Sequence, residues 1–186
     1  MTNFLAQPLT LPCGVVLKNR LGKSAMTEGL ADKFDRPTKR HNVLYNTWSN
    51  GGTGLNITGN VMVDHQYLER AGNVVFENDQ DLGLFEAWAK AGTTEGAHLW
   101  VQLNHPGRQC PKIVNKQPLS PSDIHLDLLG NFGKPRAMTE TDIQDVIQRF
   151  TTSAALVKKA GFSGVQIHCA HGYLFSQFLS PKINRR

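Results

Sequence analysis

The sequence predicts an α/β fold in which four parallel strands alternate with helices. Short apolar runs that read as strands are separated by amphipathic stretches with helical spacing. The four runs cover residues 20–26, 54–58, 98–103 and 164–167. This repeated strand–helix order favours parallel strands joined by right-handed crossovers. A doubly wound sheet has the same order, but no GxGxxG motif follows the first strand, so a Rossmann dinucleotide site has no support.

A β-hairpin is predicted ahead of the first strand. Residues 9–11 and 15–17 are apolar-rich and flank Pro12-Cys13-Gly14, which is a turn signal. The strand over residues 20–26 follows, although Gly22 and Lys23 interrupt its apolar pattern.

The first helix is predicted from Pro37-Thr38 to about Asn50, where Gly51-Gly52 stops it. Its apolar spacing suggests one shared face, made by Val43, Leu44, Thr47 and Trp48. Residues 61–78 are expected to form a loop after the second strand.

The second helix is expected to run to about Glu95, with Asn78 or Asp79 as its cap and Gly96 ending it. Core packing is predicted for its apolar face, which consists of Leu82, Phe85, Trp88 and Ala89.

Residues 104–138 are rich in Pro and Gly and lack periodicity, which is typical of a loop that carries function or closes a site. Thr139 then predicts a helix N-cap, with Asp142 completing a capping box, and Gly161 ends the helix. The apolar stripe expected to lie on the sheet is Ile143, Val146, Ile147, Phe150, Ala154 and Val157.

Two imidazoles and a phenol, His168, His171 and Tyr173, directly follow the fourth strand. Parallel α/β folds build catalytic sites at this carboxyl end. A metal site is one interpretation, but two His are too few and no carboxylate is nearby in the sequence. A buried structural network is the second. The third is a pair of imidazoles that donate hydrogen bonds to a substrate oxygen, with the phenol as general acid.

Other polar residues follow the earlier strands. Thr27 lies after the first strand, where an ordinary turn hydroxyl is the alternative interpretation. Gln102 lies near the end of the third strand, and its amide can donate and accept at once, which suits the edge of a pyrimidine-like ring. A buried amide bonded to backbone is nearly as common.

Three separated motifs resemble the Old Yellow Enzyme family. His168-Cys-Ala-His171-Gly-Tyr173-Leu-Phe-Ser-Gln-Phe-Leu-Ser-Pro181 resembles the family's signature after the fourth barrel strand. Gln102-Leu-Asn-His105-Pro-Gly107-Arg108 resembles its segment after the third strand, and Asn19-Arg20-Leu with Ser24-Ala25-Met26-Thr27 resembles its first strand. Three motifs in the right order are far more specific than any one of them.

The resemblance implies an FMN-dependent ene-reductase that passes hydride from NAD(P)H to the activated C=C of an enone or enal. It implies that His168 and His171 hold the substrate carbonyl oxygen and that Tyr173 delivers the proton. It also implies contacts to the flavin ring by Ala25, Met26, Thr27, Asn60, Gln102 and His168. Gly59 precedes Asn60, and a flavin approaching the backbone there is one interpretation; a turn that ends the strand is the other.

The resemblance covers residues 1–186 as the N-terminal half of a (β/α)8 TIM barrel, with the hairpin at the bottom. A complete barrel needs about 250 residues, and the chain has 186. Such barrels form the phosphate site from loops after strands seven and eight, so FMN's phosphate has no evident place here. The alternative function is therefore a truncated or split half-barrel that serves only as an assembly unit. Its open edges predict self-association or a complementary C-terminal half-barrel.

Composition argues against several other classes of function. The net charge is +5, but the basic residues are scattered along the sequence, so no nucleic-acid binding is predicted. No apolar stretch approaches the ~20 residues of a membrane helix, and no signal peptide is seen. The three cysteines have no CxxC spacing, which favours reduced thiols and a cytoplasmic location.

Overall fold

Four parallel strands form the centre of the structure, a computed structural model that describes residues 3–186. Their order in the sheet follows their order in the chain. The strands are β3 (Gly22–Lys23), β4 (Leu55–Met62), β6 (His98–Asn104) and β9 (Gly164–Ile167). The short strand β5 (Val74–Val75) extends the sheet beside the end of β4.

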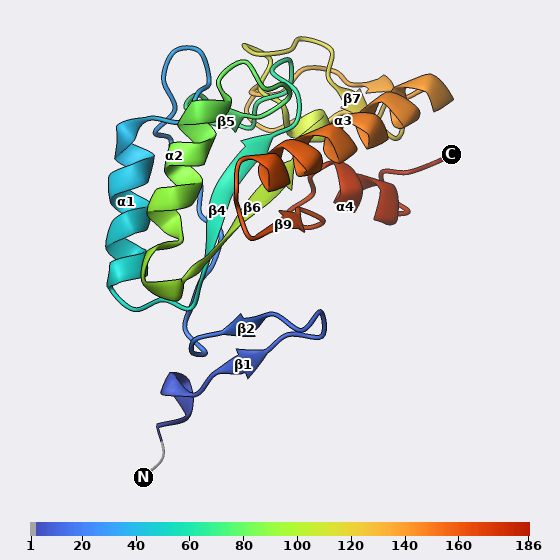
Figure 1. Cartoon of the computed structure of the whole chain (residues 1–186). Helices are drawn as coiled ribbons and strands as arrows, with labels where there is room; N and C mark the ends of the chain where they lie inside the picture. The colour runs from blue at the N-terminus through green and yellow to red at the C-terminus, as the bar shows by residue number, and fades with distance from the viewer. Residues whose placement is uncertain (1–2) are drawn as a thin grey trace.

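Three helices lie along one side of this sheet (Figure 1). They are α1 (Lys39–Asn50), α2 (Leu82–Gly92) and α3 (Glu140–Lys159). A doubly wound sheet reverses its strand order and carries helices on both faces. The described residues do neither, so the predicted parallel α/β arrangement is confirmed in the form that a barrel uses.

The alternation of side chains along β6 separates the two faces of the sheet. Leu99, Val101 and Leu103 are fully buried and belong to the core beneath the helices. Trp100 and Gln102 point the other way and are half-buried. The helix-covered face is therefore a closed core, whereas the opposite face is partly open.

The predicted hairpin is present as β1 (Leu9–Thr10) paired antiparallel with β2 (Val16–Leu17). It follows a short 3₁₀ helix, η1 (Phe4–Ala6). Figure 1 shows the hairpin beyond the amino ends of the central strands, which is the bottom of the sheet.

The buried face of α1 differs from the predicted one. Val43 is 67% exposed and Thr47 is exposed, whereas His41, Tyr45 and Ser49 are buried. Aromatic packing explains the difference, because the rings of His41 and Tyr45 lie 4.7 and 5.4 Å from that of Trp88 on α2. Leu44 and Trp48 flank this face and are partly buried against the core, as predicted.

Several element boundaries also differ from the prediction. Strand β3 is only two residues long, and β4 continues to Met62 instead of ending near Thr58. Helix α2 begins at Leu82, because the side chain of Asn78 accepts from the N–H of Gln80 in a turn and caps no helix. It ends at Gly92, and a 3₁₀ turn, η2 (Thr94–Gly96), follows. Its core residues Phe85, Trp88 and Ala89 are buried as predicted.

Helix α3 begins as the sequence indicates. The Thr139 hydroxyl accepts from the N–H of Asp142, and the Asp142 carboxylate accepts from the N–H of Thr139. Val146, Phe150 and Val157 are buried, but Ile147 is 51% exposed. The predicted stripe was therefore one residue too wide, since Ile147 lies past the edge of the face that meets the sheet.

The long connection between β6 and α3 is mostly irregular, as predicted. It contains η3 (Gly107–Gln109), and β7 (Leu119–Ser120) pairs with β8 (Arg136–Ala137). A further helix, α4 (Leu174–Leu179), follows the fourth strand and was not predicted.

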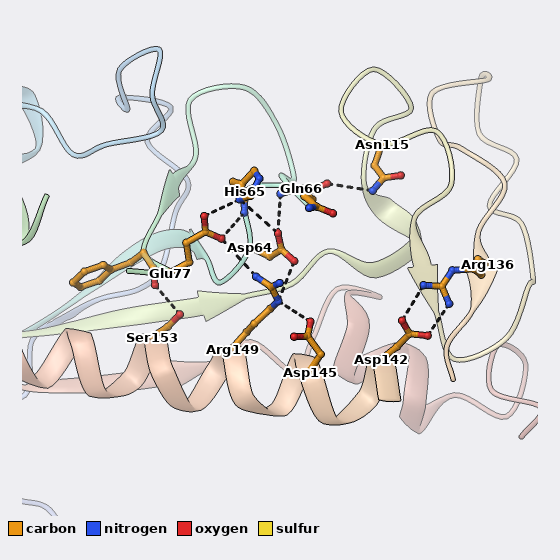
Figure 2. A network of polar contacts seen from close by, with 11 residues as sticks. Asp64, His65, Gln66, Glu77, Asn115, Arg136, Asp142, Asp145, Arg149 and Ser153 are labelled. Carbon is orange, nitrogen blue, oxygen red and sulfur yellow. Dashed lines mark hydrogen bonds and ion pairs between the residues drawn. The ribbon is translucent and has the colours of Figure 1, made fainter. Parts of the chain in front are cut away.

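A network of charged side chains ties the connection after β4 to α3 (Figure 2). Arg149 on α3 contacts Asp64 at 3.3 Å, Asp145 at 2.7 Å and Glu77 at 3.6 Å. The Glu77 carboxylate also contacts His65 at 2.7 Å. The two ends of the 64–77 connection are thus held against the same helix.

None of the helices in residues 3–186 combines the length and the apolar character that crossing a membrane requires.

The buried ring of His105 makes stability depend on pH. Its Nδ1 accepts from the N–H of Gly107, and burial, with a smaller contribution from Arg149, lowers its pKa to about 3 from an ordinary 6.5. Between these values the unfolded chain binds more protons than the folded one, so the free energy of unfolding falls as the pH falls. One such group contributes at most about 1.4 kcal/mol per pH unit.

We expect His105→Asn, which keeps an acceptor for Gly107, to flatten this dependence. Urea unfolding of both proteins from pH 6.5 down to about 4 measures it. Parallel slopes in the two proteins would contradict the assignment to His105.

Candidate active site

A pocket of about 490 Å³ lies at the carboxyl ends of the central strands. All eight residues that the sequence singled out line it. They are Ala25, Met26, Thr27, Asn60, Gln102, His168, His171 and Tyr173. Residues from four separate strand ends are therefore neighbours in space, as expected when parallel strands end at one edge of a sheet.

His168, His171 and Tyr173 form one cluster of rings. The ring of His168 lies 5.1 Å from that of His171 and 4.8 Å from that of Tyr173, centroid to centroid. The chain turns tightly between them, with positive φ at His171 (56°) and Gly172 (74°). This turn brings two imidazoles three residues apart to one side, and Tyr173 occupies the N-cap position of α4.

The hydrogen bonds of His168 define its tautomer. Its Nδ1 accepts from the N–H of Ala170 at 3.2 Å, so in the neutral ring Nε2 carries the proton. Burial, and next the neighbouring His171, lower the pKa of His168. A neutral imidazole that donates through Nε2 suits a ligand oxygen in the pocket.

The Gln102 side chain donates to the Oε1 of Gln166 on β9 at 2.5 Å. The amide thus bonds to another pocket side chain and not to the backbone. Gln166 is a further pocket residue that was not predicted. It lies directly opposite Gln102 in the parallel pair of β6 and β9, so both side chains point to the same face of the sheet.

Asn60 and Thr27 lie together because two backbones pass very close. A Cβ on Gly59 would lie 2.5 Å from the Met26 oxygen and 2.6 Å from the Thr27 Cα. The missing side chain of Gly59 therefore makes room for the 26–27 backbone and not for a flavin. The strand also continues through this position, so a strand-ending turn is wrong as well.

The Glu28 carboxylate fixes this crossing. It accepts from the N–H of Gly59 at 3.0 Å and from the hydroxyl of Tyr45 on α1. The segment after β3, the middle of β4 and α1 therefore meet at the Glu28 side chain, beside the pocket residue Thr27.

Glu69 and Arg70 also line the pocket, and neither residue was predicted from the sequence. They lie in the 61–78 segment, which has no periodicity from which a site could be read. Two adjacent opposite charges in a loop were the only signal.

The pocket fits a flavin ring on the chemistry of its donors and acceptors. Asn60 is buried, and its Oδ1 has no hydrogen-bond partner among the described residues. The Gln102 amide and the Thr27 hydroxyl line the same pocket. A buried unpaired acceptor costs free energy, so a ligand N–H at this place would be stabilising.

The group of side chains that is spaced for a metal ion lies outside the pocket lining. In residues 3–186, the ligand atoms of Asp64, His65 and Glu77 lie close enough together for one ion, and His168 and His171 belong to no such group. The Asp64 and Glu77 oxygens already accept from Gln66 N–H, His65 and Arg149. This group is therefore accounted for as an ion-pair network.

Comparisons with known proteins identify a matching family. The family described as NADH:flavin oxidoreductase / NADH oxidase matches residues 5–186. The chain is 37% identical to the NADH-dependent flavin oxidoreductase iliE of Hypocrea jecorina (strain QM6a), over 96% of this chain and 49% of that protein. It is 33% identical to an NADPH dehydrogenase of Geobacillus sp. (strain WCH70), over 100% of this chain and 54% of that protein.

Among solved structures, an old yellow enzyme homologue from Zymomonas mobilis superposes with a TM-score of 0.87 at 26% identity. The match covers 98% of this chain and 53% of that one. The chain thus spans about half the length of the relatives it matches, and its fold corresponds to the predicted half of an eight-stranded β/α barrel.

Proposed function

The chain belongs to the NADH:flavin oxidoreductase / NADH oxidase family, and we propose that the whole protein is an FMN-dependent ene-reductase. Its substrates are α,β-unsaturated carbonyl compounds, both enones and enals, and its reductant is NAD(P)H. The observation that carries the proposal is the cluster of His168, His171 and Tyr173 around one pocket. The unpaired thiols of Cys13, Cys110 and Cys169 suit a reducing compartment such as the cytoplasm.

FMN would be held at its ring by Ala25, Met26, Thr27, Asn60, Gln102 and His168. When bound, it supplies hydride transfer between the nicotinamide and the activated C=C. The buried Oδ1 of Asn60 and the amide of Gln102 offer acceptor and donor groups to the polar edge of the ring.

His168 and His171 bind the substrate carbonyl oxygen. The protonated Nε2 of His168 donates one hydrogen bond, and His171 lies beside it. Such donors draw electron density from the alkene and stabilise the enolate-like transition state.

Tyr173 holds the proton that the substrate α-carbon receives. A phenol carries its proton at neutral pH, and burial, and next the carboxylate of Glu69, raise the pKa of Tyr173 above its ordinary value. A general acid must carry its proton at the working pH and lie within reach of the reacting atom.

The role of Tyr173 is tested by Tyr173→Phe in the flavin-loaded protein. We expect alkene reduction to slow by about 10²–10⁴-fold, while NAD(P)H oxidation stays nearly unchanged, because only the alkene half-reaction needs the proton. Stopped-flow measurement of each half-reaction separates them. Tyr67 is a buried tyrosine outside the pocket lining, so Tyr67→Phe is the matched control. An equal loss in both half-reactions would mean that Tyr173 is structural.

The flavin assignment is tested by Gln102→Leu. Leucine keeps the bulk but leaves polar atoms of the ring unpaired, so FMN binding should weaken by about 1–3 kcal/mol. Titration of the apoprotein with FMN, followed by flavin fluorescence, gives the affinity. The exposed Gln148→Leu on α3 is the control. Unchanged affinity and spectrum in Gln102→Leu would remove Gln102 from the ring site.

The alternative, an assembly unit, is favoured by the open sheet. Strands β3 and β9 are the outer members of the sheet and pair on one side only. The face of Trp100, Gln102 and Gln166 is only half-buried, and Ile167 at the edge is 39% exposed. A complementary half-barrel would pair both edges and cover this face.

Residues 1–186 expressed alone are accordingly expected to self-associate or to remain partly molten and flavin-free. Unpaired strand edges promote association between chains, and soluble monomers rarely expose a large contiguous apolar patch. Size-exclusion chromatography with light scattering and near-UV circular dichroism measure both outcomes. A rigid, flavin-loaded monomer of 20.6 kDa would refute this expectation.

A further inference from the structure

One wall of the pocket carries a charged pair that the function proposed above leaves without a role. Glu69 and Arg70 follow β4 in the connection to β5, and both line the cavity that holds Tyr173. The Glu69 side chain is 9% exposed, whereas that of Arg70 is 61% exposed. Burying a carboxylate to this extent costs free energy unless the carboxylate is paired and hydrogen-bonded.

Each oxygen of Glu69 has a separate set of neighbours. Oε1 accepts from the Nε of Arg70 at 2.7 Å and lies 2.6 Å from its Nη2. Oε2 accepts from the Thr27 hydroxyl at 3.4 Å and from the Asn60 amide at 3.5 Å. The carboxylate therefore bridges the arginine and the inner wall of the pocket.

The backbone under this pair is fixed. The N–H groups of Glu69 and Arg70 both donate to the Oδ1 of Asn73, at 3.0 and 2.8 Å. At the ends of the same connection, Asp64 and Glu77 are held to Arg149 on α3 (Figure 2). The charge of Glu69 consequently has a defined place relative to Tyr173.

We propose that Glu69 and Arg70 are positioning residues that set the proton affinity of Tyr173, so that its phenolate regains a proton readily after each transfer. A fixed negative charge beside a phenol disfavours the phenolate, and Arg70 opposes part of that effect. The inference rests on the role proposed above for Tyr173 as general acid.

The other groups that face Tyr173 do not supply this effect. The rings of His168 and His171 lie 4.8 and 6.4 Å from the phenol ring, and either ring would favour the phenolate if it were charged. Asn60 is uncharged and favours the phenolate through a hydrogen bond. Glu69 is thus the anionic group of the pocket that acts in the required direction, together with burial of the phenol.

The proton step balances without another reactant. The Tyr173 O–H bond breaks as its proton forms a C–H bond at the substrate α-carbon, and the phenolate then takes a proton from water. Glu69 favours this return, because its charge makes the phenolate more basic.

Substitutions of the two charges should shift the ionisation of Tyr173 in opposite directions. Glu69→Gln keeps an oxygen for Arg70 and removes the negative charge, so the midpoint of Tyr173 ionisation should fall by about one pH unit. Arg70→Gln removes the positive charge and should raise it, while Arg70→Lys should restore it. The exposed Glu86→Gln on α2 is the charge-matched control and should leave it unchanged.

The midpoint of Tyr173 ionisation is measured by the near-UV absorbance of tyrosinate in the complete flavin-loaded protein. The signal of Tyr173 is isolated by subtracting the titration of the same variant that also carries Tyr173→Phe. The pH at which alkene reduction declines should move with the absorbance midpoint. Because Arg70 is largely exposed, Arg70→Gln gives a folded test even if Glu69→Gln is unstable.

Unchanged midpoints, or shifts in the same direction in Glu69→Gln and Arg70→Gln, would overturn the inference. If the absorbance midpoints move in opposite directions but the decline of alkene reduction does not follow them, the control of Tyr173 by this pair holds. In that case the general-acid role of Tyr173 is the part that fails.

Discussion

The carboxylate of Glu28 is the interaction on which the arrangement of the pocket most depends. It accepts from the N–H of Gly59 and from the hydroxyl of Tyr45, so it joins the segment after β3 to β4 and to α1. Lys23 lies in the same cage, 3.3 Å from the Tyr45 hydroxyl and over the Trp48 ring. Burial lowers the pKa of Lys23 to about 8, and the nearby Glu28 partly offsets this effect. Because β3 is only two residues long, few backbone hydrogen bonds join it to β4. The contacts of Glu28 and Lys23 hold the two segments together in place of a longer ladder.

The close backbone crossing at Gly59 follows from this constraint. The β4 backbone lies against Met26 and Thr27, and no side chain fits between them. Thr27 and Asn60 are consequently held on one wall of the pocket, where Gln102 and His168 approach from the next two strands. Backbone packing therefore brings these polar side chains to one pocket.

Two sets of polar side chains have different tasks. Asp64, Glu77 and Arg149 satisfy one another and fix the connection after β4 to α3. By contrast, the Oδ1 of Asn60 has no hydrogen-bond partner among the described residues, and the His168 ring lines the cavity. Satisfied charges stabilise the frame, and unsatisfied or cavity-facing groups are available to a ligand.

The sequence by itself determined the parallel α/β order, the α3 capping box and the core face of α2, because apolar periodicity and cap chemistry are local patterns. The eight pocket residues came from polar positions at strand ends together with the resemblance of three motifs to a known family. Tertiary structure alone decided that His41 and Tyr45, and not Val43, face the core, since packing against Trp88 outweighs the apolar spacing. It also decided the role of Gly59, the pairing of Gln102 with Gln166, and the place of Glu69 and Arg70 in the pocket. Each of these depends on a contact between residues remote in sequence or on an irregular loop, and neither leaves a periodic signal in the chain.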